Sequence, residues 1–441
     1  MDWRSKYGHK VVSAEEAVAR VKPGDTVMMA PYTCTPFTLC NALQERARRG
    51  DIERVRIDHP AAFPSWTSPD IAHAFELHDN YATPLNREAC HEGRMEYLPV
   101  GVWKSYEVPA GFTSHPDVFM VPVSPPDERG YCSFGPGVWL SGTLSRHAKL
   151  VIGEVQENFI RTYGENYIHV DQIDLLVEGT VPTGTAPAVQ PSEEERSQVE
   201  VICTLVASEL VNDGDTLQMG VGTVSASLGL FLGDKQDLGI QTELITGGVV
   251  DLVEKGVVTG NRKSIHKHKV VGAACVALGP EEMARVHMNP AFELYDFGYT
   301  DDLRRLIQLD NFVTVNNALV VDLTGQVSAE SLDHRMYTGV GGQTVFMLAG
   351  AYSPGGKSVS VVPSSSVPST TGQRVSRIVP TLAPGGAVTV PRTFIDYVVT
   401  EYGIATLRGK TLKERARELC AVSHPDFRPE LEMAAREMYG A

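Results

Sequence analysis

The stretch Gly239–Glu254, GIQTELITGGVVDLVE, contains the side chain best placed for covalent chemistry. It sets a carboxylate, Glu243, between an apolar run typical of a buried strand and the glycine pair Gly247 and Gly248. A carboxylate can act as a nucleophile, and adjacent glycines allow a ligand or another backbone to approach closely. The alternative is a glutamate at the end of a strand that faces solvent. From this stretch alone, the solvent-facing glutamate is the favoured interpretation.

Three glycine-rich turns in the second half of the chain could bind an anion. The first, Met219–Val224 (MGVGTV), follows an apolar run, and Ser225 stands where a dinucleotide fingerprint has its third glycine. That context favours a phosphate or pantetheine group, with a simple tight turn as the alternative. The other two turns, Thr338–Gln343 (TGVGGQ) and Ser353–Lys357 (SPGGK), end in polar side chains. They could surround a thioester oxygen or phosphates, or they could be hairpin or cap glycines.

The elements that must position these residues occur twice along the chain. Gly24–Met29 (GDTVMM) and Gly214–Met219 (GDTLQM) align without a gap, and a helix that starts with a capping box precedes each. Between the two copies, Gly179–Pro191 is rich in Gly, Pro and Thr, which indicates a linker or a long loop. We therefore expect two domains of related design, residues 1–190 and residues 191–441.

Apolar runs that fit strands buried on both faces alternate with helical patterns in both halves. Examples are VFMVPV at Val118–Val123, KVVGAACVAL at Lys269–Leu278 and FVTVNNALVVDL at Phe312–Leu323. Such runs, spaced by helices, are typical of mainly parallel sheets. The predicted fold class is therefore α/β, with two open, mainly parallel-sheet domains. In such sheets ligands bind at the carboxyl ends of the strands.

Composition limits the partners of this 441-residue chain. A formal net charge of -15 argues against a nucleic-acid partner, because no extended basic patch is left to release counterions from phosphates. The seven cysteines include no CxxC pair, which fits reduced, buried thiols and predicts no metal site. No apolar run approaches the roughly 18 residues of a membrane span. We expect a cytoplasmic protein without a membrane partner, and interpret the basic cluster Lys263–Lys269 as a solvated edge rather than a phosphate site.

Several longer segments carry a resemblance to a known family. In chain order they are SPPDERGYCSFG at Ser124–Gly135, VDLTGQVSAES at Val321–Ser331, GVGGQ at Gly339–Gln343, SPGGK at Ser353–Lys357, VVTEYGIATLRGK at Val398–Lys410 and HPDF at His424–Phe427. Together they resemble the acetyl-CoA hydrolase/transferase family over almost the whole chain. Within that family, the length and the DERGYCSFG and TEYG segments are most similar to 4-hydroxybutyrate and butyryl-CoA:acetate CoA-transferases.

The resemblance implies CoA-transferase-type domains with the active site in the cleft between them. It matches Glu243 to the family's nucleophilic glutamate, and it implies that the GxG turn and Lys357 lie near CoA. We assign the oxyanion donors to the backbone N–H groups of Gly341 and Gly342, with help from Gln343 or Asn316. The predicted site residues are Glu243 as the catalytic nucleophile, and Gly220, Val221, Gly222, Thr223, Val224, Asn316, Gly341, Gly342, Gln343 and Lys357 for cofactor binding.

The predicted function is that of an acyl-CoA:carboxylate CoA-transferase that works through a glutamyl-CoA thioester on Glu243. The expected partners are an acyl-CoA thioester, as substrate, and a small carboxylic acid, with no tightly bound cofactor and no metal. We expect a homodimer or a higher homo-oligomer. The alternatives are an acyl-CoA thioester hydrolase on the same scaffold, a non-catalytic CoA-binding homologue, and a sugar-phosphate isomerase on a similar sheet.

Departures from the family's pattern bear on the substrate. After GGQ the family usually has an aspartate and an arginine, where this chain has Val345 and Leu348, and Ser225 replaces the usual proline of the GxG turn. We therefore expect the chemistry to be retained and the acyl pocket to be altered. The predicted acid is short-chain or a small dicarboxylic or hydroxy acid, 4-hydroxybutyrate-like, or itaconate with succinyl-CoA as donor. Candidates to bind a far-end carboxylate, each also plausible at the surface, are Arg87, Arg161 and Arg335.

Overall fold

The computed structural model of the protein describes residues 3–58, 66–102, 115–183, 192–220, 222–368 and 371–441. The chain divides into two units, one of residues 1–187 with 271–300 and one of residues 188–270 with 301–441. The first unit thus includes a segment, 271–300, that the predicted division places in the second domain. The units are described separately below as unit 1 and unit 2.

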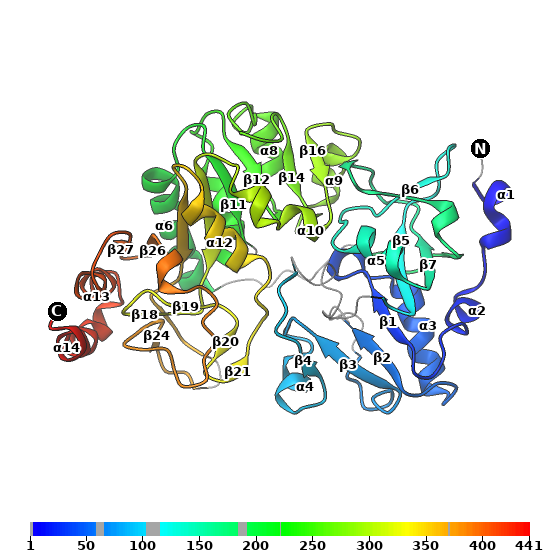
Figure 1. The fold of residues 1–441 in the computed structure, drawn as a ribbon, viewed down its shortest axis with the longest axis horizontal. Coiled ribbons are helices and arrows are strands. Elements are labelled where there is room, and N and C mark those ends of the chain that lie inside the picture. Colours follow the sequence, from blue (N-terminus) through cyan, green and yellow to red (C-terminus); the bar gives the residue numbers. More distant parts are fainter. Residues whose placement is uncertain (1–2, 59–65, 103–114, 184–191, 221, 369–370) are drawn as a thin grey trace. The chain divides into compact units, whose positions relative to one another are not determined.

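Unit 1 is built, within the described residues, on a seven-stranded parallel sheet of order β10-β7-β5-β1-β2-β3-β4 (Figure 1, blue to cyan). The interior strand β5 has every residue buried, as expected for a strand covered on both faces. The strands are β1 (Thr26–Met29), β2 (Val55–Asp58), β3 (Phe75–Asp79), β4 (Glu96–Tyr97), β5 (Val118–Val123), β7 (Leu150–Val155) and β10 (Leu175–Glu178). The helices before residue 188 are α1 (Trp3–Tyr7), α2 (Ala14–Val18), α3 (Phe37–Arg48), α4 (Arg87–His91) and α5 (Ser141–His147).

Smaller elements complete unit 1. The strand β6 (Tyr131–Ser133) pairs antiparallel with β9 (Tyr167–His169), and β8 (Tyr163–Gly164) pairs parallel with β16 (Phe292–Leu294). The segment 271–300 also contains β15 (Ala274–Cys275), α9 (Pro280–Val286) and α10 (Phe297–Thr300).

Unit 2 contains a sheet in which the strand order is β27-β26-β22-β17-β11-β12. All neighbouring pairs are parallel except the last at one edge, where β26 and β27 form an antiparallel hairpin around the TEYG segment. The strands are β11 (Thr216–Met219), β12 (Gly239–Gln241), β17 (Phe312–Asn317), β22 (Lys357–Val361), β26 (Tyr397–Thr400) and β27 (Gly403–Thr406). The helices are α6 (Glu193–Leu205), α7 (Thr223–Ser227), α8 (Val249–Glu254), α11 (Leu303–Leu306), α12 (Gln343–Tyr352), α13 (Leu412–Ala421) and α14 (Arg428–Tyr439).

Short strands occupy the loops of unit 2, and β14 (Val270–Gly272) lies where the two units meet in sequence. The short strands are β13 (Leu244–Ile245), β18 (Val320–Asp322), β19 (Val327–Ser328), β20 (Ser331–Leu332), β21 (Arg335–Met336), β23 (Ser365–Ser366), β24 (Val375–Ser376) and β25 (Ile378–Val379).

The predicted duplication of local structure is confirmed. The helices α2 and α6 both begin with capping boxes, in which Ser13 and Ser192 exchange hydrogen bonds with a glutamate three residues later. The turns that follow place Gly24 at φ +88° and Gly214 at φ +83°, a conformation that glycine adopts without strain. Each turn leads into a buried strand, β1 or β11. The prediction of an α/β fold with mainly parallel sheets is therefore confirmed.

Two further observations concern the composition. The seven cysteines are all free thiols, and all but Cys90 are buried. Among the residues that the structure describes, no helix combines the length and the apolar character that a membrane crossing requires.

Glu154, at the end of β7, is a buried carboxylate that holds two elements of unit 1 together. Its side chain has no exposed surface, and its two oxygens accept hydrogen bonds from the Leu39 N–H of α3, at 3.0 Å, and from Nε2 of Gln156, at 2.7 Å. Burial raises the pKa of Glu154 to about 7, and these two hydrogen bonds oppose the rise. The carboxyl group is therefore easier to protonate in the folded protein than in the unfolded chain.

This shift predicts how stability depends on pH. The native pKa of about 7 exceeds the ordinary value of 4.5, so the stabilisation is complete below about pH 4.5 and is lost as the pH rises to about 7. The Glu154→Gln variant should lack this fall of roughly 3 kcal/mol in the free energy of unfolding. Denaturant titrations across this pH range test it, with Glu178→Gln, at an exposed position, as the control. Parallel pH curves for the wild type and Glu154→Gln would contradict the assignment.

Candidate active site

Glu243 lies at the carboxyl edge of the unit 2 sheet, two residues beyond the end of β12. The strands β11, β12 and β17 are parallel, so the GxG turn after β11 and the end of β17 lie at the same edge. The hydroxyl of Thr242 donates to the main-chain oxygen of Met219 at 3.1 Å, which fastens the segment that carries Glu243 to the end of β11. Glu243 therefore lies at the carboxyl edge of the parallel strands, the edge at which ligands generally bind in open parallel sheets.

The Glu243 carboxylate is held by the backbone of Gly342. The Gly342 N–H donates to Oε2 of Glu243 at 3.0 Å, and Gly342 is the N-cap residue of α12. A Cβ at position 342 would lie 2.3 Å from Oε2 of Glu243 and 2.9 Å from the Phe346 ring, so no larger residue fits there without a rearrangement. The preceding residue, Gly341, has φ +52°, which also favours glycine. The GG turn therefore brings a backbone donor and the start of a helix to the carboxylate.

Two opposing effects act on the charge of Glu243. Burial raises the pKa of Glu243 to about 7, and the hydrogen bond from the Gly342 N–H opposes that rise. The N-terminal end of α12, a helix of 10 residues, also favours negative charge at this position. The result is a carboxylate that is more basic than an exposed glutamate.

A second carboxylate, which the sequence analysis missed, lies beside Glu243. Oδ2 of Asp301 is 2.5 Å from the position that a Cβ of residue 342 would occupy, the same point that lies 2.3 Å from Oε2 of Glu243. The Asp301 side chain has no exposed surface. In the sequence it is one of two adjacent aspartates in YTDDL, and no pattern distinguishes it from Asp302.

Gln343 places a buried side-chain donor at the start of α12. It is the first residue of α12, and its side-chain Nε2 is buried without a hydrogen-bond partner among the described residues. A buried amide N–H without a partner is costly in a folded protein unless a ligand or water satisfies it. The turn formed by Gly341, Gly342 and Gln343 therefore lies at the Glu243 carboxylate.

Asn316 lies at the same edge but is engaged with another side chain. Its amide exchanges hydrogen bonds with that of Gln218, at 3.0 Å and 2.8 Å, and both side chains are buried. A Cβ at Gly220 would lie 2.9 Å from Oδ1 of Asn316, so this pair lies directly under the GxG turn. Asn316 therefore supports the turn that the sequence analysis predicts to contact CoA.

The GxG turn is fixed by a residue that was not predicted, Asn317. Its Oδ1 accepts from the N–H of Ser225, at 3.0 Å, and from the Ser225 hydroxyl, at 2.7 Å. A Cβ at Gly222 would lie 2.2 Å from Cγ of Asn317. Thr223 and Val224 begin α7, while the predicted residue Val221 lies outside the described residues. Ser225, which replaces the family's proline, thus supplies both donors of this contact.

Lys357 is not brought together with the other predicted residues. It is the first residue of β22 and pairs with Val313 near the start of β17, so it lies at the amino edge of the parallel strands. Its Nζ donates to the main-chain oxygen of Leu210 at 2.8 Å and is 3.4 Å from Oδ2 of Asp215. Lys357 therefore lies at the amino end of the sheet, opposite the edge that bears Glu243.

The interpretation of the Lys263–Lys269 cluster as a solvated edge is wrong for Lys263. That side chain is 1% exposed, and its ammonium donates to the main-chain oxygens of Ile240 and Lys269 and to Oε1 of Gln241, at 2.7, 2.8 and 3.2 Å. The three acceptors compensate for the loss of water around the charge. Because Ile240 and Gln241 end β12, Lys263 helps to fix the strand from which Glu243 follows.

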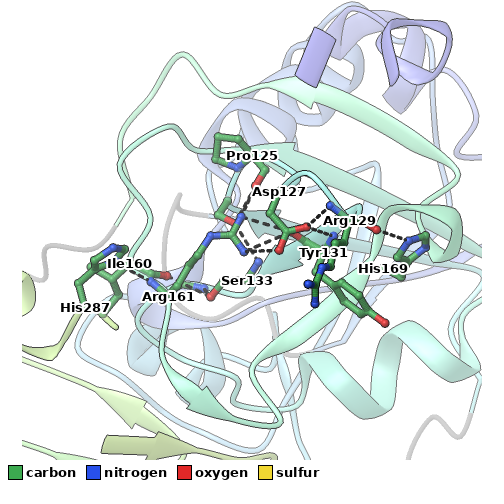
Figure 2. A network of polar contacts seen from close by, with 11 residues as sticks. Pro125, Asp127, Arg129, Tyr131, Ser133, Ile160, Arg161, His169 and His287 are labelled. Atoms are coloured by element: carbon green, nitrogen blue, oxygen red, sulfur yellow. Dashed lines mark hydrogen bonds and ion pairs between the residues drawn. The ribbon is translucent and has the colours of Figure 1, made fainter. Parts of the chain in front are cut away.

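Three arginines were considered as partners of a substrate carboxylate. One of them, Arg161, uses its guanidinium for contacts within unit 1. Its guanidinium donates to the main-chain oxygens of Pro125, at 2.6 Å, and Tyr131, at 3.2 Å, and is 3.9 Å from the Asp127 carboxylate (Figure 2). The DERGYC turn is therefore braced by this side chain. Arg335 is exposed in β21, and Arg87 begins α4.

Comparison with known proteins identifies the family. The model for the acetyl-CoA hydrolase/transferase N-terminal domain matches residues 1–182, and that for the C-terminal domain matches residues 279–435. The chain therefore belongs to the acetyl-CoA hydrolase/transferase family, and the predicted resemblance is confirmed.

Relatives that match this chain over nearly their full length indicate which class of enzyme within the family it resembles. The chain is 36% identical over 438 residues to a 4-hydroxybutyrate coenzyme A transferase from Clostridium kluyveri, covering 98% of each chain. It is also 36% identical over 442 residues to a succinyl-CoA:cyclohexane-1-carboxylate CoA transferase from Geobacter metallireducens, covering 99% of this chain and 97% of the relative. The crystal structure of RipA from Yersinia pestis superposes with a TM-score of 0.89 at 33% identity, over 100% of both chains. These similarities support an enzyme of the CoA-transferase class.

The contact between Gly342 and Glu243 yields a test of the site. Gly342→Ala should lower turnover with an acyl-CoA and a carboxylic acid on the order of 100-fold or more, because the new Cβ displaces the carboxylate from its backbone donor. The matched control is Gly233→Ala, where a Cβ would meet nothing within 4 Å. Turnover by Gly342→Ala equal to that of the control would show that this contact is dispensable.

Proposed function

We propose that the protein is an acyl-CoA:carboxylate CoA-transferase that works through a glutamyl-CoA thioester on Glu243. The observation that carries this proposal is the Glu243 carboxylate, desolvated and hydrogen-bonded to the Gly342 N–H at the start of α12. The full-length similarity to CoA-transferases supports the substrate class, an acyl-CoA thioester with a small carboxylic acid.

In the proposed reaction, every nucleophile and every leaving group is an anion, either a carboxylate or a thiolate. A carboxylate oxygen of Glu243 attacks the thioester carbonyl, the C–S bond breaks, and CoA departs as the thiolate, which leaves a mixed anhydride between Glu243 and the acyl group. The thiolate then attacks the glutamyl carbonyl, the bond from that carbon to the acyl carboxylate oxygen breaks, and the first acid departs. An acceptor carboxylate reverses these steps and regenerates the Glu243 carboxylate. No proton is consumed or released in either half.

Donors at the glutamyl carbonyl are the main requirement of the second step. When the thiolate attacks that carbonyl, negative charge collects on a glutamyl oxygen, and the Gly342 N–H already bonds Oε2 of Glu243 in the free enzyme. The buried, unpartnered Nε2 of Gln343 supports a second donor from the same turn. We assign these groups, with Gly341, to the oxyanion site.

We propose that the turn Gly220–Val224 binds CoA and that Asn316, which lies against Gly220, supports this turn. For the acid we propose a short-chain or small dicarboxylic or hydroxy acid, of the 4-hydroxybutyrate or itaconate kind. Val345, where the family has an aspartate, is 4% exposed on α12, so an apolar residue occupies a position next to the GG turn. This supports an acyl environment that differs from the family's usual one. A cytoplasmic homo-oligomer completes the proposal.

A thioester hydrolase would use the same glutamyl thioester and differ in admitting water to it. The two functions are distinguished by measuring CoA release from an acyl-CoA with and without an added carboxylic acid. A panel of acyl-CoA donors crossed with carboxylic acids, with product thioesters identified by mass, then defines the substrates. Release that does not depend on the acid would favour the hydrolase.

The covalent intermediate gives a direct prediction. After incubation with an acyl-CoA, the intact mass of the wild-type protein should increase by the mass of a CoA thioester, located on Glu243 by peptide mapping. Glu243→Gln should form no adduct and lose transfer by several orders of magnitude. Glu254→Gln, an exposed position in the same stretch, should behave as the wild type. Transfer at a normal rate by Glu243→Gln would refute the mechanism.

The pKa of Glu243 gives a second prediction. Because only the ionised carboxylate attacks and its pKa is raised to about 7, the single-turnover rate of adduct formation should rise with pH through about 7. An exposed glutamate would instead be fully reactive above about pH 5. Rapid quenching with detection of the CoA adduct measures the profile, and a flat rate between about pH 5 and pH 8 would contradict the shift.

A further inference from the structure

One turn, Gly339–Gln343, carries the backbone donor of the proposed site and is fixed at both of its ends. On the entry side, the N–H of Thr338 donates to the main-chain oxygen of Glu330 at 3.0 Å. On the exit side, Thr344 is the second residue of α12, and its hydroxyl donates to the main-chain oxygen of Thr389 at 2.8 Å. Glu330 and Thr389 therefore hold one end of the turn each.

A side-chain hydrogen bond joins these two partners. The Thr389 hydroxyl donates to Oε1 of Glu330 at 2.9 Å and accepts from the N–H of Ala329 at 2.9 Å, so its donor and its acceptor are both used. Thr389 is 3% exposed and Glu330 is half-buried. A hydrogen bond to a carboxylate that is partly removed from water is stronger than one between neutral groups. This bond closes a ring of contacts around the turn.

The main chain at Thr389 is held independently of its side chain. The N–H groups of Thr389 and Val390 both donate to the main-chain oxygen of Val327, at 2.9 Å and 3.1 Å, and the Val327 N–H donates back to Val390 at 3.1 Å. Both valines are buried in one apolar cluster of unit 2. The Thr389 main chain is therefore a fixed anchor for the start of α12, and the Thr389 hydroxyl fixes where Glu330 lies relative to that anchor.

The turn must be placed accurately, because its contact with the proposed nucleophile is tight. The Gly342 N–H lies 3.0 Å from Oε2 of Glu243, and a Cβ at Gly342 would lie 2.9 Å from the Phe346 ring on its other side. A hydrogen bond weakens steeply when its length and angle depart from their preferred values. A small displacement at either end of the turn therefore reaches the bond to Glu243.

We propose that Glu330 and Thr389 act as a clamp on the Gly339–Gln343 turn. Through the turn, this clamp aims the Gly342 N–H at the Glu243 carboxylate. Both are positioning residues, since they act on the nucleophile only through the turn. The inference rests on the proposed function, because it assigns the clamp a part in forming the glutamyl thioester.

Single-turnover formation of the CoA adduct tests the clamp. Thr389→Val keeps the shape of the side chain and removes the hydroxyl, so the limiting rate at high pH should fall on the order of 10-fold to 100-fold. The Gly342 N–H lowers the pKa of Glu243, so a weaker bond should also move the midpoint of the pH–rate profile above about 7. Thr389→Ser keeps the hydroxyl and should restore both the rate and the midpoint.

A second variant tests the other end of the clamp. Thr344→Val removes the bond from α12 to the Thr389 main chain and leaves the bond between Thr389 and Glu330 in place. It should lower the limiting rate and raise the midpoint in the same directions as Thr389→Val. The carboxyl groups of Asp301 and Glu330 are unchanged in this variant, so the shifted midpoint is assigned to Glu243.

Thr400→Val is the matched control. The Thr400 side chain is fully buried, and its hydroxyl likewise accepts from one N–H, that of Tyr402 at 3.0 Å, and donates to one main-chain oxygen, that of Val422 at 2.6 Å. These contacts lie at the hairpin of β26 and β27 and not at the clamped turn. The control should resist denaturant less well than the wild type and keep the wild-type rate and midpoint.

The outcomes separate this inference from the proposed function. An adduct on Glu243 of the wild type upholds the function, and a wild-type rate and midpoint in Thr389→Val would then overturn the clamp. A slower rate with an unchanged midpoint, or an equal loss in Thr400→Val, would also overturn it, because either result reflects general destabilisation. Absence of any adduct on the wild type would instead overturn the proposed function. If Thr389→Val fails to fold, the profile of Thr344→Val decides the question.

Discussion

The site depends on one hydrogen bond, from the Gly342 N–H to the Glu243 carboxylate. The contact forms only because residue 342 has no side chain, since a Cβ would lie 2.3 Å from the acceptor oxygen. It also directs the start of α12 toward the charge, so the backbone supplies both a donor and a favourable field. Within the part of the chain that the structure describes, no cation pairs with Glu243, and this matters for the proposed mechanism. A strong ion pair would lower the pKa and the nucleophilicity of Glu243, whereas a single amide leaves the carboxylate basic.

Contacts that take no direct part in the chemistry fix the position of Glu243. Lys263, fully enclosed, joins the last two residues of β12 to the Lys269 carbonyl, and Thr242 joins the next residue to the end of β11. A buried ammonium is tolerated only when its donors are satisfied, so this contact is geometrically demanding. Such rigidity suits the proposed reaction, in which a displaced thiolate must return to the carbonyl of the same glutamate.

Local patterns predicted most of the fold, and they failed where partners are distant in sequence. The apolar runs at Val118–Val123 and Phe312–Asn317 are strands, and both capping boxes are present, because each depends on residues only a few positions apart. Asp301 could not be predicted because its place beside Glu243 depends on the turn at Gly342. Lys357 is different, since a signal was available. The SVSV run that follows it predicts a strand, and a lysine that begins a parallel strand lies at the edge away from the ligands.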